Sequence, residues 1–257
     1  MSAPGKLGSS GSDAAFFSTS GPRIRSSVEV KLEEARSEMD GMVVEIELTL
    51  ISIIQGVALT FLIERAENVV SIRNAVFWPY VAAGLLVIFV FWSRSVLHII
   101  TVIRWPLEFG HNFLYITCAL IEAILFTRLT NPTAWFAMGA LFGAVGWILF
   151  SYDLRLIKAR QIDSPGPASN QLIEIVKRDQ WLNIAVLVPG VTLSNLACFL
   201  CIRFWPGFFL DRQFHVILAI AQVAGFGIYL AYVIRHFRKV APLVARARAE
   251  WRSTPEG

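Results

Sequence analysis

Long apolar blocks alternate with short polar connections along this chain. A transmembrane helix needs roughly 20 apolar residues to cross a hydrocarbon core of about 30 Å. Six blocks approach or exceed that length, at residues 42–63, 76–97, 111–128, 133–153, 181–203 and 213–235. The pattern therefore predicts an all-α fold, that of a polytopic membrane protein with six transmembrane helices.

Composition favours a membrane protein over a soluble one. Of the 257 residues, 55% are hydrophobic and only 16% are charged, whereas soluble domains carry roughly 25% charged residues. The net charge of +4 is too small to indicate a nucleic-acid partner. The three cysteines, Cys118, Cys198 and Cys201, all lie inside apolar blocks, so they indicate no disulfide framework.

Lysine and arginine are concentrated on one side of the predicted membrane. The N-terminal arm, the second and fourth connections and the C-terminal tail hold most of them, and the other three connections hold few. Basic residues are retained in the cytoplasm, and an even number of spans places both ends on the same side. We therefore expect both termini to be cytoplasmic, in a multi-pass protein of a plasma membrane or an inner membrane.

The segments that flank the spans differ in composition. Residues 1–28 are rich in Ser and Gly and predict a disordered arm. Residues 29–41 have charges at helical spacing and predict a cytoplasmic helical extension of span one, ahead of a membrane domain at 42–235. Residues 236–257 form a basic tail, which we expect either to lie against anionic lipid headgroups or to be solvated.

Two carboxylates inside the first span raise the question of which way each one faces. At 100° per residue, Glu45, Thr49 and Ser52 fall on one stripe of the helix. Polar side chains in lipid normally face protein or water, so this stripe is predicted to line the bundle interior. Glu47 lies about 200° from Glu45 by the same arithmetic, and we interpret it as a boundary residue near the inner headgroups.

Glu122 of the third span is the strongest single candidate for a functional residue. It shares one helix face with His111, Tyr115 and Cys118. Counting from Phe113, it is about 14 Å into the span, which predicts a position near the midplane and beyond easy reach of either surface. A carboxylate there should be protonated, paired or in contact with a water-filled cavity.

Polar residues of the fifth and sixth spans complete a predicted path. Span five carries Asn195 after a Pro189-Gly190 pair, which predicts a kink with freed carbonyls, and span six carries Gln222 and Tyr229. Spans one, three, five and six are therefore predicted to surround a polar interior. Span two has few polar groups and span four has a glycine-rich face, so both are predicted to be packing or lipid-facing elements.

These features favour a channel or transporter over an enzyme. The expected cargo is a cation, a proton or a small polar solute, because carboxylates are among the lining groups. The predicted path residues are Glu122, Glu45, Gln222, Asn195, His111, Tyr115, Thr49, Ser52 and Tyr229. The sequence contains no catalytic motif, and no cofactor is expected. The alternative is a non-transporting sensor, assembly subunit or effector, and a homo-oligomer is possible.

A metal site in the outer half of the bundle is a third possibility. Cysteine thiols, an imidazole and a carboxylate together suit a metal ion. The residues that could meet there are Cys118, Cys198, Cys201, Glu122 and His215. Small residues that only pack are a more common reason for a Cys-x-x-Cys pattern in an apolar helix.

Two limited sequence similarities bear on the fold. IRWPLEF at 103–109 and IRFWPGFF at 202–209 would align Glu122 with Gln222 if the two halves were inverted repeats, a plan of many transporters. EMDGMVVEIELTL at 38–50 resembles the start of the first helix in the six-helix potassium channel family of bacteria and lysosomes. It keeps only Asp40-Gly41 of that family's Phe-Ser-Asp-Gly motif, so no family is assigned.

Overall fold

The computed structural model describes residues 27–71, 75–102, 108–162 and 166–253, and these residues form helices without strands. The elements are α1 (Ser27–Ser71), η1 (Ala75–Phe77), α2 (Trp78–Val102), α3 (Phe109–Phe126), α4 (Pro132–Ile162), α5 (Pro167–Leu182), η2 (Asn183–Leu187), α6 (Val188–Phe204), η3 (Gly207–Asp211) and α7 (His215–Ser253). Six helical segments of the described chain are long and apolar enough to cross a membrane, the fifth comprising α5, η2 and α6. The predicted all-α fold with six candidate spans is confirmed.

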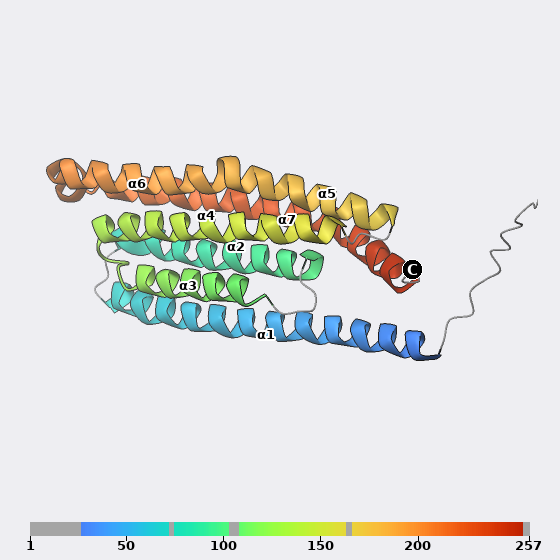
Figure 1. The fold of residues 1–257 in the computed structure, drawn as a ribbon. Coiled ribbons are helices and arrows are strands. Elements are labelled where there is room, and N and C mark those ends of the chain that lie inside the picture. Colours follow the sequence, from blue (N-terminus) through green and yellow to red (C-terminus); the bar gives the residue numbers. More distant parts are fainter. Residues whose placement is uncertain (1–26, 72–74, 103–107, 163–165, 254–257) are drawn as a thin grey trace, which may run out of the picture.

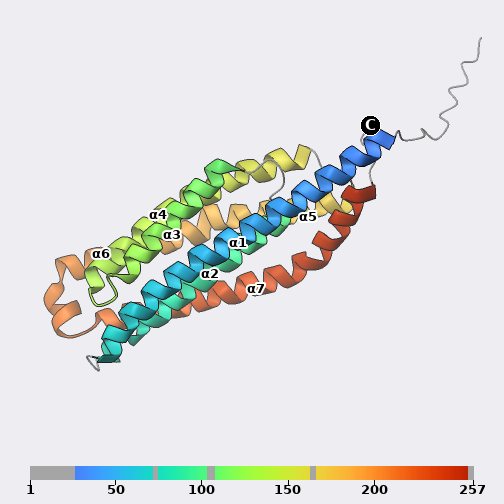
Figure 2. The ribbon, with the colours of Figure 1, turned by 90° about the horizontal axis from the view of Figure 1, so that it is seen from below.

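The helices form two columns of three, which Figures 1 and 2 show from two sides. In one column α2 lies between α1 and α7, and in the other α4 lies between α3 and the α5–α6 segment. Contacts of α1 with α3, and of α5 with α7, join the columns at both edges. Helices α2 and α4 therefore form a middle layer.

The predicted arrangement of the spans is wrong in this respect. Spans one and three were expected to meet spans five and six around a polar interior, but α1 and α3 lie on one side of the middle layer and α5, α6 and α7 on the other. The apolar sequence of α2 and α4 did not reveal their central position, because a residue that packs in protein and one that faces lipid tails are equally apolar.

Glycines let α4 and α6 approach each other closely. A Cβ atom on Gly139 would lie 2.5 Å from Asn195 Oδ1, and one on Gly143 would lie 2.4 Å from Thr192 Oγ1. Small residues at helix interfaces commonly permit such approach in membranes. The predicted small-residue face of span four is therefore a helix-packing face over its first two glycines, whereas a Cβ on Gly146 would meet nothing within 4 Å.

Substitution of Gly143 by alanine is expected to lower the free energy of unfolding by about 1–3 kcal/mol, the usual cost of overpacking. The new methyl would press on the Thr192 side chain and would also lie 3.3 Å from its Cα. Gly146→Ala is the matched control, and it should cost nothing because its Cβ has open space. Denaturant unfolding in detergent micelles measures both, and equal losses would contradict the close approach.

The fifth span changes its helical hydrogen bonding just before a proline. Residues Asn183–Leu187 form a π-helix, in which each carbonyl accepts from the N–H five residues later. For the Ile184 carbonyl that residue is Pro189, which has no N–H to donate. The indole Nε1 of Trp147 donates to this carbonyl over 2.9 Å. The predicted release of a backbone carbonyl before Pro189 is thus confirmed.

Both described ends of the chain lie at the same end of the bundle (Figure 1). Helix α1 includes the predicted extension at 29–41, while the predicted arm falls almost wholly on residues 1–26, outside the described part. Helix α7 continues to Ser253 without a break, so most of the predicted tail belongs to it. Val240 and Val244 of this part are buried against α5 and its neighbours, which a free tail at the lipid surface would not show.

The packing gives no support to an inverted repeat. Helix α1, the first span of its half, contacts both other helices of that half. In the second half it is the second span, the α5–α6 segment, that contacts both others. Equivalent spans of the two halves therefore occupy different positions. Residues 103–107 of the first matching segment lie outside the described part of the chain.

Candidate functional site

The buried face of α1 is opposite to the one predicted. Glu45, Thr49 and Ser52 are exposed on the bundle surface, so this part of the predicted path is wrong. The Ser52 hydroxyl donates to its own Leu48 carbonyl over 2.8 Å. Serine and threonine can face lipid in this way because the helix backbone satisfies them, which is why their positions did not mark the interior.

Glu47 is the glutamate of this pair that faces protein. Its side chain is only 2% exposed, and its Oε1 accepts a hydrogen bond from Asn112 Nδ2 over 2.7 Å. The interpretation of Glu47 as a headgroup residue is therefore wrong, and its partner is a neutral amide on α3.

Glu122, Gln55 and Tyr115 form a buried group between α1 and α3, which we call the Glu122 group. Glu122 is 0% exposed. Gln55 Nε2 lies 3.2 Å from Glu122 Oε2 and 3.3 Å from the Tyr115 hydroxyl. Glu122 Oε1 and Gln55 Oε1 are also buried, yet neither is hydrogen-bonded to any described residue. Two adjacent buried acceptors without a donor are unusual in native proteins.

Glu122 lies in the second half of helix α3. Helix α3 ends at Phe126, which places Glu122 about 6 Å from that end and about 20 Å from Phe109 along the helix axis. The face shared with His111, Tyr115 and Cys118 is buried as predicted. The carboxylate is therefore embedded in protein, nearer to the α3–α4 turn than to the centre of its helix.

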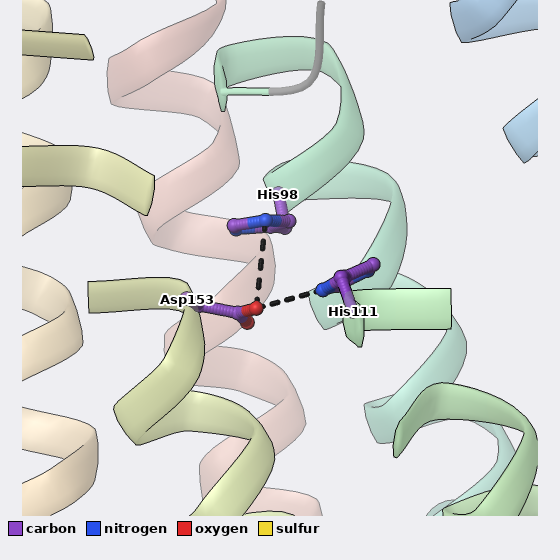
Figure 3. A group of neighbouring side chains, drawn as sticks. All are labelled: His98, His111 and Asp153. Carbon is purple, nitrogen blue, oxygen red and sulfur yellow. Dashed lines mark hydrogen bonds and ion pairs between the residues drawn. The ribbon is translucent and has the colours of Figure 1, made fainter. Parts of the chain in front are cut away.

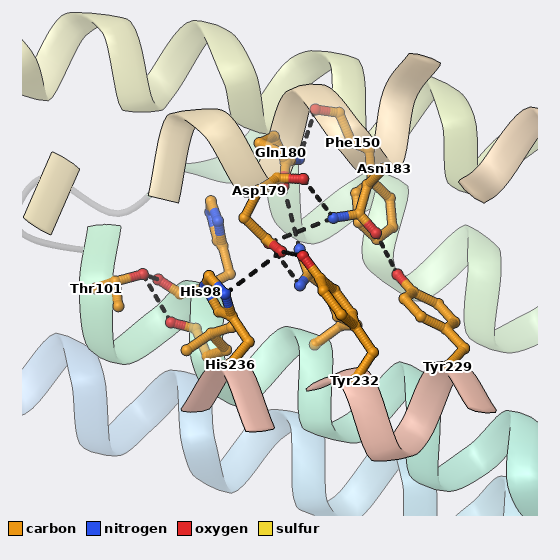
Figure 4. A network of polar contacts seen from close by, with 11 residues as sticks. His98, Thr101, Phe150, Asp179, Gln180, Asn183, Tyr229, Tyr232 and His236 are labelled. Carbon is orange, nitrogen blue, oxygen red and sulfur yellow. Dashed lines mark hydrogen bonds and ion pairs between the residues drawn. The ribbon is translucent and has the colours of Figure 1, made fainter. Parts of the chain in front are cut away.

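A second buried group surrounds Asp179 of α5 on the other side of the middle layer, and we call it the Asp179 network (Figure 4). Arg94 of α2 forms an ion pair with Asp179 Oδ2 at 2.7 Å. The Tyr232 hydroxyl donates to Asp179 Oδ1 over 2.5 Å, and His236 Nδ1 lies 3.7 Å from the same oxygen. The side chains of Arg94 and Asp179 are 8% and 3% exposed.

The Asp179 network extends along the π-helical turn. Asn183 Nδ2 donates to the backbone carbonyl of Asp179 over 2.7 Å, and the hydroxyl of Tyr229 donates to Asn183 Oδ1. Gln180 Nε2 donates to the Phe150 carbonyl over 2.7 Å. Tyr229, a residue of the predicted path, is therefore part of this network. The middle layer of α2 and α4 separates it from the Glu122 group.

Gln222 and Asn195, which were both expected to line the path, are hydrogen-bonded to each other on the side of the middle layer away from the Glu122 group. Gln222 Nε2 donates to Asn195 Oδ1 over 2.9 Å, and the indole of Trp135 donates to Gln222 Oε1 over 2.8 Å. These three side chains join α4, α6 and α7. The three side chains are hydrogen-bonded to one another, so the arrangement is a structural crosslink.

His111 belongs to a third group, at the end of the bundle where α2 ends and α3 begins. Its Nδ1 lies 2.7 Å from Asp153 Oδ1, and His98 Nε2 lies 3.6 Å from the same oxygen. We call His98, His111 and Asp153 the His–Asp cluster. All three side chains are buried, and the rings of the two histidines are stacked with centroids 4.8 Å apart.

Two small cavities lie along the seam between α2 and α4. One of about 20 Å³ is lined by the His–Asp cluster together with Arg94 and Gln180. The other, of about 60 Å³, is lined mainly by apolar side chains of α2, α4, α6 and α7. Phe91, Arg94 and Phe150 line both cavities. The seam, which sequence reasoning did not predict, is thus polar toward one end and apolar farther along.

The buried titratable residues of α2, α4 and α5 that the sequence analysis did not propose are Arg94, His98, Asp153 and Asp179. Each lies near the edge of a predicted span or in a connection, where a charged residue is ordinarily solvated. The helices α2, α4 and α5 extend past those predicted edges, which draws these residues into the bundle. One feature of the sequence could have indicated these residues: acidic, basic and histidine side chains occur together at the same predicted end of neighbouring spans.

The cysteine-based metal site is not assembled. Among the described residues, the group of three or more potential ligands whose donor atoms come together is the His–Asp cluster. Cys118 is buried within α3, and Cys198 and Cys201 are half-buried free thiols on α6. No family model, curated protein or solved structure matches this chain.

Proposed function

We propose that this protein moves protons across a membrane, with Glu122 as the buried site that binds and releases them. The observation that carries the proposal is the fully buried carboxylate whose Oε1 has no donor among the described residues. Ionisable residues are rare within membrane spans, and they commonly mark ion pathways and proton relays. A carboxylate needed only for packing would be expected to have both oxygens satisfied.

The size of the interior favours a proton over a larger cargo. A cavity of about 20 Å³ beside the His–Asp cluster has room for about one water molecule. The 60 Å³ cavity is larger but mainly apolar. Neither would hold a hydrated metal cation or a polar solute, whereas a proton needs only a chain of titratable groups and waters.

The Glu122 group adjoins the seam through an aromatic contact. Tyr115, which is linked to Glu122 by Gln55, stacks on Phe91 of α2 with centroids 4.8 Å apart. Phe91 lines both seam cavities. The proposed route therefore runs from Glu122 past Tyr115 to the polar end of the seam. It replaces the predicted path through an interior surrounded by spans one, three, five and six.

The orientation and the membrane that we expect from the sequence are part of the proposal. The His–Asp cluster lies where α2 ends and α3 begins, and both described chain ends lie at this end of the bundle (Figure 1). With the basic connections inside, this end faces the cytoplasm of a cell bounded by a plasma or inner membrane. The basic residues of α7 near this end, which include Arg246 and Arg248, would then face anionic headgroups.

Reconstitution of the purified protein into liposomes tests this function. An imposed pH gradient should collapse faster than in protein-free vesicles, as read by an enclosed pH dye under a potassium–valinomycin clamp. A parallel assay reads potassium flux without a pH gradient. Gradients that last equally long with and without protein would overturn the proposal, and potassium flux alone would reassign the cargo.

A non-transporting membrane component is the second candidate, and one observation favours it. Phe91, the side chain that joins the Glu122 group to the polar end of the seam, is apolar, and the seam farther along is lined mainly by apolar side chains. Hydrophobic segments of this kind can block ion passage by excluding water. A complete lack of flux in the liposome assay would favour this candidate.

A further inference from the structure

We infer that the His–Asp cluster is a binding site for a divalent transition metal of the zinc type. Figure 3 shows His98, His111 and Asp153 converging from α2, α3 and α4. One donor atom from each lies within 4.8 Å of the other two. Two imidazoles and one carboxylate are a common ligand set for zinc, with a fourth position left for water. This inference does not depend on the proposed proton transport.

His98 supplies an observation that points to a ligand. Its Nε2 is buried without a hydrogen-bond partner among the described residues, and its side chain is only 8% exposed. The Asp153 oxygen is 3.6 Å away, which is too far for a hydrogen bond. A buried imidazole nitrogen normally has a partner, and this one borders the 20 Å³ cavity that the other two ligands also line.

The present distances between the ligand atoms are close to those of a zinc site, and metal binding requires the two imidazole rings, now stacked with an interplanar angle of 20°, to turn so that both nitrogens point at one ion. Ligand atoms of a tetrahedral zinc site with bonds of 2.0–2.2 Å are about 3.3–3.6 Å apart. His98 Nε2 and Asp153 Oδ1 are already 3.6 Å apart. His111 Nδ1 and Asp153 Oδ1, now 2.7 Å apart, would separate as the metal takes the place of the hydrogen bond between them, and His111 would bind through a deprotonated Nδ1.

Arg94 also lines the cavity, and its positive charge opposes a cation. Its guanidinium, however, is paired with Asp179 at 2.7 Å and lies 3.4 Å from Gln180 Oε1. Asp179 thereby offsets the arginine charge, which leaves Asp153 as the anionic ligand for the two histidines. The charge balance of the site consequently permits a divalent ion.

Zinc binding to the full-length protein tests the inference. The purified protein, freed of any histidine tag and treated with a chelator, is equilibrated with zinc in detergent, and metal per chain is measured by mass spectrometry. We expect about one zinc per chain, and X-ray absorption should show two imidazole nitrogens with bonds of about 2.0–2.1 Å. No bound zinc, or bound zinc without imidazole ligands, would overturn the inference.

Two histidine variants localise the metal. His98→Gln should weaken zinc binding by about 100-fold or more, because loss of even a supporting residue costs about 10–100-fold. His215→Gln is the matched control, since this buried histidine lies at the other end of the bundle and its Nδ1 is paired with the Tyr80 hydroxyl at 2.9 Å. Equal affinity in His98→Gln and wild type, with both correctly folded by circular dichroism, would contradict the assignment.

Discussion

Replacing Asp179 by leucine is expected to lower the free energy of unfolding by about 3–5 kcal/mol, the usual cost of removing one partner of a buried ion pair. The substitution leaves the Arg94 guanidinium, which is 8% exposed, without its counter-charge. It also removes the acceptor for the Tyr232 hydroxyl. Unfolding of the protein in mixed micelles, followed by circular dichroism, measures the loss.

Two controls separate the buried pair from charge in general. Glu174→Gln alters an exposed carboxylate on the same helix, 3.3 Å from Lys177, and should cost no more than about 1 kcal/mol. The double variant Arg94→Met with Asp179→Leu removes both buried charges and should recover most of the lost stability. A double variant as unstable as Asp179→Leu alone would contradict the pairing of these two residues.

Glu122→Gln is expected to reduce proton flux in liposomes by about tenfold or more, because an amide side chain does not bind and release a proton as a carboxyl group does. The substitution keeps the size of the side chain and its ability to accept from Gln55 Nε2, so folding should be preserved. Initial rates of internal pH change at equal protein density provide the measurement.

Glu45→Gln is the matched control for this effect. Both glutamates lie in candidate spans, but Glu45 is exposed on the bundle surface and should leave the flux unchanged. Equal flux in wild type and in Glu122→Gln would remove Glu122 from the route. Equal losses in both variants would instead show that flux responds to general charge in the membrane.

The number of spans was readable from the sequence because it depends on length and hydrophobicity alone. The buried stripe of span three was also predictable, because His111, Tyr115, Cys118 and Glu122 are of types that seldom face lipid together. The same reasoning failed for span one. The Ser52 hydroxyl bonds to its own helix backbone, so it does not need to face protein. The residues of span one that do face protein, Glu47 and Gln55, are fewer than the exposed polar residues of the predicted stripe.

The order of the helices in the bundle was not predictable from the sequence. It depends on pairs that are far apart along the chain, such as Arg94 with Asp179 and His111 with Asp153. Hydrophobic periodicity gives each helix a face but no partner. The position of α2 and α4 between the other layers therefore required the structure, and with it the seam that contains the cavities.

Infrared difference spectroscopy of the protein in bilayers tests most directly whether Glu122 exchanges protons. The spectrum of wild type should contain a band from a protonated carboxyl group that changes intensity when the bulk pH is varied. The same band should be missing from Glu122→Gln and present in Glu45→Gln. A Glu122 band that does not respond to pH on either side of the membrane would contradict the account, because a carboxyl group that never exchanges its proton cannot carry one.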